Sequence, residues 1–163
     1  MDKFTGRVWV LGDDIDTDII IPTEYLALKT IDDMKQYGFS PLRPELAGQI
    51  QKGDIIVAGK NFGCGSSREQ APEVIKALGI PCIIAKSFAR IFYRNALNNG
   101  LLLLEQPELH DVVKEGDTIT VTVNEDVDYN GKKYPIASLP ENLMEIIEAG
   151  GLVKAMRRRN GLD

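Results

Sequence analysis

Cysteine and histidine are scarce in this sequence, which limits the metal chemistry that the chain can support alone. The 163 residues include two cysteines, Cys64 and Cys82, without CxxC spacing, and one histidine, His110. A structural zinc site takes roughly four Cys or His ligands, and an iron–sulfur cluster usually takes roughly three or four thiolates. We therefore predict that this chain binds no metal itself. A Ser-His-Asp triad is excluded too, unless His110 folds beside the nucleophile.

Long apolar runs and concentrated positive charge are missing as well. The longest apolar stretches, such as residues 80–85, are too short to cross a bilayer, and the N-terminus lacks an apolar segment of signal-peptide length. We expect a cytoplasmic protein that binds no membrane. The net charge of −5 disfavours nucleic acid as a partner. The basic residues 157–159 are expected to form an exposed helix end, with a subunit contact as the alternative.

The length and composition are those of one globular domain. The chain is 44% hydrophobic and 26% charged, which is ordinary for a soluble protein, and it shows no internal repeat or Pro/Ser-rich linker. We expect residues 1–163 to form a single domain.

The hydrophobic pattern predicts alternating strands and helices. The expected strands are residues 6–11, 54–58, 81–85, 101–104, 117–123 and 133–137, with a hairpin turn at Asn130-Gly131. The expected helices are residues 30–37, 67–78, 87–97, 141–149 and 152–158. Strand–helix–strand order implies right-handed crossovers and parallel pairing. The expected class is α/β, with a mixed, partly parallel sheet or β/β/α layers.

The most informative segment is the glycine-rich stretch 59–65 with the polar residues that follow it. It stands where a buried strand turns into a helix, which is where ligands gather in open α/β sheets. Ser66, Ser67 and Arg68 at an anion-friendly helix start suit a carboxylate or phosphate substrate. Arg68 would oppose the helix dipole there unless it holds an anion. The alternative is that Ser66 only caps the helix, because Ser66-x-x-Glu69 is a capping box.

Other ligand signatures fail on inspection. Residues 63–68 break the dinucleotide fingerprint because Arg68 stands at its last glycine position, and the sequence contains no P-loop. The acidic loop, residues 13–18, resembles the start of a calcium loop, but Ile19 and Tyr25 stand where that loop needs Gly and Glu. We expect its carboxylates to bond to nearby backbone instead.

Three motifs stand in order along roughly residues 8–105. Their sequences are GDDIDTDIIIP at residues 12–22, GCGSSRE at 63–69 and KSFARIF at 86–92, the last followed by Asn95 and by residues 99–102. In sequence and spacing they resemble the swivel domain of the aconitase and isopropylmalate isomerase family. The resemblance implies an aconitase-type swivel fold. The short chain is similar to the free-standing small subunits of that family, which lack the cluster-binding domains.

The resemblance implies a hydro-lyase that works in a heteromeric complex. The expected reaction moves a hydroxyl group to the neighbouring carbon of a hydroxy-dicarboxylate by loss and return of water, with 3-isopropylmalate in leucine biosynthesis as the expected substrate. A [4Fe-4S] cluster on a large partner subunit would bind the leaving hydroxyl, which agrees with the cysteine shortage here. Ser66 matches the catalytic base, and Ser67 and Arg68 match substrate-carboxylate positions. Lys86 and Arg90 are candidates for a supporting or domain-contact role.

The resemblance also points to the loop that contacts the distinguishing group of the substrate. Here that loop reads Tyr25, Leu26, Ala27, Leu28. An apolar loop suits an isopropyl group, since each buried methylene contributes about 0.8 kcal/mol; the alternative is that its leucines cover the core. Because Lys29 follows, homoaconitate and 2,3-dimethylmalate stay open as substrates, as does a non-catalytic carboxylate-binding module. Cys64 is expected to be a packed small residue rather than a ligand.

Overall fold

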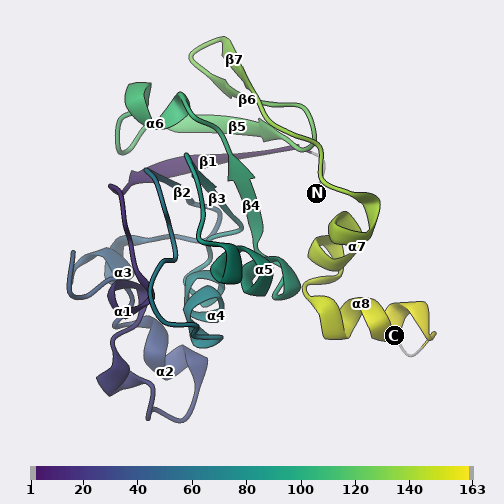
Figure 1. The fold of residues 1–163 in the computed structure, drawn as a ribbon. Coiled ribbons are helices and arrows are strands. Elements are labelled where there is room, and N and C mark those ends of the chain that lie inside the picture. Colours follow the sequence, from purple (N-terminus) through teal and green to yellow (C-terminus); the bar gives the residue numbers. More distant parts are fainter. Residues whose placement is uncertain (1–2, 162–163) are drawn as a thin grey trace.

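One mixed β-sheet organises the chain. The computed structural model describes residues 3–161, and within them seven strands lie in the order β4-β3-β2-β1-β5-β6-β7 (Figure 1). The strands are β1 Lys3–Val10, β2 Ile55–Ala58, β3 Cys82–Ala85, β4 Leu102–Glu105, β5 Thr118–Thr122, β6 Asp126–Tyr129 and β7 Lys132–Pro135. Strands β1 to β4 pair in parallel, whereas β5, β6 and β7 pair antiparallel. The expected α/β class with a partly parallel sheet is confirmed.

The two halves of the sheet bury their residues differently. All four residues of β2 and of β3 are buried, as expected for continuous apolar strands covered on both faces. Strand β5 instead alternates between buried and less buried residues, as expected for a strand with one solvent-exposed face. The hairpin between β6 and β7 turns at Asn130 and Gly131, whose φ angles of 52° and 82° fit the expected tight turn.

Strand β1 joins the two halves. Its first residues pair antiparallel with β5, for example Phe4 with Val121, and its last residues pair in parallel with β2, for example Val8 with Ile55. The sheet is therefore continuous only through β1.

Helices surround the parallel half, and four of them in the described part of the chain reach eight or nine residues. These are α4 Gln70–Ala77, α5 Arg90–Asn98, α7 Glu141–Ala149 and α8 Leu152–Arg159. The shorter ones are α1 Thr17–Ile20, η1 Thr23–Tyr25, α2 Ile31–Lys35, α3 Leu46–Gln49 and α6 Leu109–Val112. In Figure 1, α4 and α5 are seen below the parallel strands, and α7 and α8 lie to the right. Within residues 3–161, the structure contains no helix with the length and apolar character of a membrane span.

Two helices begin later than the sequence predicts. Helix α4 begins at Gln70 rather than residue 67, and α5 begins at Arg90 rather than residue 87. The residues before α5 instead form a bridge between neighbouring loops, in which the Ala89 N–H donates to the carbonyl of Phe62 at 2.9 Å. The residue before α4 is Glu69, and no side chain caps this helix. The alternative that Ser66 only caps the helix is therefore wrong.

Candidate active site

The three sequence motifs meet at the carboxyl ends of the parallel strands. The acidic loop follows β1, the serine turn (residues 63–69) follows β2, and residues 86–89 lead from β3 into α5. This is the edge at which open α/β sheets collect their ligands. The topology therefore brings together segments that lie far apart in the sequence.

Hydrogen bonds from the acidic loop position the serine turn. Thr17 is buried; its N–H donates to the carbonyl of Cys64 at 2.9 Å, and its Oγ1 donates to the carbonyl of Ser66 at 2.7 Å. The Asp13 carboxylate accepts from the Lys60 N–H at 2.7 Å, and the Asp16 carboxylate caps α1 by accepting from Ile19 at 2.9 Å. The prediction of side-chain-to-backbone bonds in this loop is confirmed.

Glycine lets α5 approach the serine turn closely. Gly63 has a φ of 85°, and a Cβ added there would lie 2.1 Å from Cγ of Phe92, at the start of α5. Gly65 has a φ of 90°, which any other L-residue adopts only with strain. These two positions set the path of the chain immediately before Ser66.

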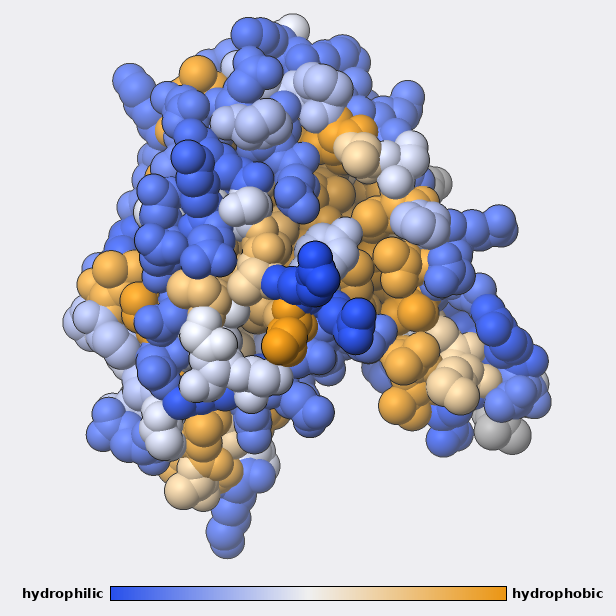
Figure 2. Space-filling view, in the orientation of Figure 1, coloured by the Kyte–Doolittle hydropathy of each residue, from blue (hydrophilic) through white to orange (hydrophobic). Residues whose placement is uncertain are grey.

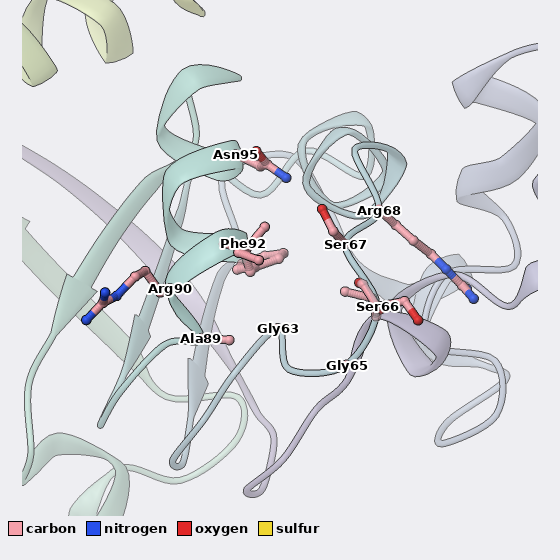
Figure 3. A pocket seen from close by; sticks show the side chains of 11 residues that line it. Gly63, Gly65, Ser66, Ser67, Arg68, Ala89, Arg90, Phe92 and Asn95 are labelled. Atoms are coloured by element: carbon pink, nitrogen blue, oxygen red, sulfur yellow. The ribbon is translucent and has the colours of Figure 1, made fainter.

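A cavity of about 210 Å³ lies between the serine turn and α5. Its lining comprises Thr17, Gly63, Gly65, Ser66, Ser67, Arg68, Ala89, Arg90, Ile91, Phe92 and Asn95. Ser66 and Ser67 are exposed, so both hydroxyls are open to a ligand. In Figure 3 the hydroxyl of Ser67 and the amide of Asn95 lie on the same side of the cavity, from opposite elements. The predicted residues Ser66, Ser67 and Arg68 thus share one site.

The Arg68 side chain is held by contacts with other residues of this chain. It forms an ion pair with Asp18, and its guanidinium donates to the carbonyl of Ile21 at 2.9 Å and to Oγ1 of Thr23 at 2.7 Å. In Figure 3 it extends away from the cavity, and the side chain is only 13% exposed. The argument that only an anionic ligand would justify an arginine at the helix start is therefore wrong, because Asp18 supplies the opposite charge and α4 begins two residues later.

Comparison with known proteins identifies the family. The model for the aconitase C-terminal domain matches residues 19–109. The 3-isopropylmalate dehydratase small subunit of Lachnospira eligens is 78% identical over 162 residues, or 99% of each chain. The chain belongs to the aconitase family, among the 3-isopropylmalate dehydratase small subunits. The 3-isopropylmalate dehydratase small subunit 1 of Archaeoglobus fulgidus is 51% identical, and the match covers 94% of this chain and 99% of that protein. The crystal structure of 3-isopropylmalate dehydratase from Methanocaldococcus jannaschii matches 98% of this chain and 96% of its own with a TM-score of 0.92 at 39% identity, so the fold is shared.

In this aconitase-family chain, the loop expected to contact the substrate packs largely against the protein. Tyr25 stacks on Tyr37 with ring centroids 3.9 Å apart, while Leu26 and Leu28 are half-buried against the core and Ala27 is exposed. The cavity lining within the described residues includes none of these four. The contact of these four residues with the substrate therefore stays a prediction.

The two cysteines of this family member lie at opposite ends of the parallel strands, so they cannot hold one cluster together. Burial and the charges of Asp16 and Asp14 raise the pKa of the Cys64 thiol, which keeps it protonated. Cys82 lies fully buried at the opposite end of the parallel strands, in the first position of β3, and burial raises the pKa of its thiol even further. Cluster ligands are thiolates. Across residues 3–161 we find no group of three or more His, Cys, Asp or Glu side chains placed to hold a metal ion.

Lys86 and Arg90, the candidates for a supporting role, differ in their surroundings. Lys86 donates to the Asp111 carboxylate at 2.7 Å, and this hydrogen bond lowers the pKa of Asp111. Arg90 is exposed and points away from the cavity in Figure 3.

Sequence reasoning missed Asn95, which it noted only as part of a motif. Within residues 3–161, the side-chain amide of Asn95 takes part in no hydrogen bond, although it faces the cavity. Its place after the third motif was the signal available, because its contact with the cavity depends on how α5 packs on Gly63.

Proposed function

We propose that this chain is the small subunit of 3-isopropylmalate dehydratase, which interconverts 2-isopropylmalate and 3-isopropylmalate by dehydration and rehydration in leucine biosynthesis. The observation that carries the proposal is the near-full-length identity to small subunits of that name, 78% in one relative and 51% in another. The cavity at the serine turn supports it. The enzyme would work in the cytoplasm with a large subunit as its partner.

In this proposal Ser66 is the base that removes the proton from the substrate carbon. A serine hydroxyl is a very weak acid, so its anion needs strong stabilisation. Within residues 3–161, the backbone N–H groups of residues 65–68 donate to no protein acceptor, and they remain available for an alkoxide or a carboxylate. The bonds from Thr17 fix the backbone on which Ser66 stands.

Ser67, Arg68 and Asn95 would orient the substrate. The Ser67 hydroxyl and the Asn95 amide lie at the cavity and offer donors to a carboxylate. The Arg68 guanidinium pairs with Asp18 and extends away from the cavity, so it would bind the substrate carboxylate only after turning toward the cavity in the complex. The apolar residues 25–28 would reach the isopropyl group only in the complex with the partner.

The partner subunit would carry the [4Fe-4S] cluster, because the two thiols of this chain do not fit it. When bound there, the cluster supplies a Lewis acid for the hydroxyl group that leaves and returns. This chain would supply the group that transfers the proton and the hydrogen-bond donors to the substrate carboxylate. The complete site would therefore require both chains.

The test is reconstitution with the purified, cluster-loaded large subunit. A panel of 3-isopropylmalate, homoaconitate, 2,3-dimethylmalate and citrate is assayed by the absorbance of the unsaturated acid, which dehydration of the three hydroxy acids forms and hydration of homoaconitate consumes. We expect 3-isopropylmalate to be preferred and Ser66→Ala to lower kcat by about 10²–10⁴, the contribution of a general base. Ser67→Ala, the matched control, is expected mainly to raise KM. Near-normal turnover by Ser66→Ala would reject Ser66 as the base.

A further inference from the structure

The outer face of α5 exposes an isoleucine beside two arginines. The helix buries Phe92, Ala96 and Leu97. Its opposite side exposes Arg90 and Arg94, one turn apart, and Ile91, which is 59% exposed. Single exposed apolar side chains are common and carry no argument alone, but arginine is enriched at protein interfaces, and here two arginines stand beside the exposed isoleucine.

Neither arginine has an acidic partner in the chain. Among residues 3–161, ion pairs form at Arg7, Arg43, Arg68 and Arg159, but not at Arg90 or Arg94. The protein has 24 acidic residues and a net charge of −5, so carboxylates are abundant elsewhere on it. Like charges at positions i and i+4 of a helix repel each other. Acidic groups from another molecule would relieve that repulsion.

This face is continuous with the candidate active site on one side and with an apolar groove on the other. Ile91 and Arg90 belong to the lining of the active-site cavity. A groove of about 280 Å³ on the other side is lined by Arg90, Tyr93, Arg94, Leu97, Asn98 and, from α7, Leu143. Figure 2 shows strongly hydrophilic and strongly hydrophobic side chains next to each other over α5, with apolar surface continuing toward α7.

We propose that the outer face of α5, defined by Arg90, Ile91 and Arg94, is the surface on which the cluster-bearing large subunit docks. The inference rests on the proposed function, because a cluster brought by another chain must reach the cavity past its rim. The proposal requires an apolar pocket for Ile91 and carboxylates for both arginines on the surface of the partner. The α5–α7 groove extends the contact away from the cavity.

Isothermal titration calorimetry of the full chain against the purified large subunit tests this surface. Ile91→Asp is expected to weaken the Kd at least tenfold, because a central apolar anchor becomes a buried charge. The double variant Arg90→Glu/Arg94→Glu is expected to weaken it at least tenfold and to lose the salt dependence of association. The matched control is Val153→Asp on α8, since Val153 is 72% exposed and lines neither the cavity nor the groove. It should leave the Kd within twofold, and circular dichroism verifies that each variant is folded.

Ile91→Asp binding as tightly as Val153→Asp would overturn the proposal. A second result would also overturn it: the chain self-associates in light scattering, and Ile91→Asp abolishes this self-association but leaves binding to the large subunit unchanged. The face would then bind a second copy of the chain. If the wild-type pair assembles through α5 but isomerises no 3-isopropylmalate, the docking surface stands and the proposed function fails. We expect Ser66→Ala to bind the large subunit with the wild-type Kd, so that the loss of its activity tests the proposed function and not the docking surface.

Discussion

Gly63→Ala perturbs the contact that brings α5 against the serine turn. The φ of Gly63 is 85°, a region that costs an L-residue about 1–2 kcal/mol. The new Cβ would also lie 2.1 Å from Cγ and 2.5 Å from Cβ of Phe92. Because these atoms are near the helix backbone, the ring cannot swing aside, and overpacking of this kind costs about 1–3 kcal/mol more. The total loss of unfolding free energy should be about 2–5 kcal/mol.

Gly116→Ala separates the two contributions. Gly116 has a similar φ of 92°, but a Cβ there meets no atom within 4 Å, so only the backbone cost of about 1–2 kcal/mol applies. The assay is urea unfolding of both variants, followed by circular dichroism, with turnover of the reconstituted enzyme measured in parallel. Gly63→Ala should also lose activity through displacement of Ser66. Equal stability losses in the two variants would refute the steric argument.

Three further expectations follow from single contacts. Thr17→Val removes the 2.7 Å bond to the Ser66 carbonyl, so it should cost about 1 kcal/mol in urea unfolding and lower kcat about tenfold or more; unchanged kcat would show that Thr17 does not position Ser66. Asp54 is 8% exposed, and although burial opposes ionisation, hydrogen bonds from Gln51, Trp9 and Arg7 outweigh it and lower its pKa. Its stabilisation is therefore present above its ordinary pKa of about 4 and is lost as pH falls through the lowered value. Asp54→Asn should be less stable by about 2–3 kcal/mol at pH 7, with a smaller gap near pH 3; a gap independent of pH would contradict this. Since the pKa of Cys64 is raised, iodoacetamide at pH 8 should alkylate it more slowly in the native chain than in urea, and equal rates by mass spectrometry would disprove the shift.

Much of the fold was predictable because its signals are local. The all-buried strands IIVA and CIIA are recognisable as short apolar runs, the first between Gly53 and Gly59 and the second just after Gly79, and Asn130-Gly131 predicts its own hairpin. The helices α1, η1, α3 and α6 span three or four residues each, too few for any periodic pattern to reveal them.

The candidate site was predictable in its residue types but not in its contacts. Ser66 looked like a helix cap from local sequence alone. The bond that overrides this pattern comes from Thr17, 49 residues earlier in the chain. Likewise, the charge partner of Arg68 is Asp18, in the acidic loop. Asn95 reaches the cavity because α5 packs on Gly63, a tertiary contact. Pairings of this kind are set by topology, and no window of neighbouring residues contains them.

The place of β1 in the sheet also dictates an order of events in time. This strand precedes both of its partners in the chain, yet it is the sole seam between the parallel and antiparallel halves. During synthesis it must wait, with both edges unpaired, until β2 and then β5 emerge. A nascent chain that stalls before β5 would therefore offer to other chains an edge of β1 that the finished subunit covers.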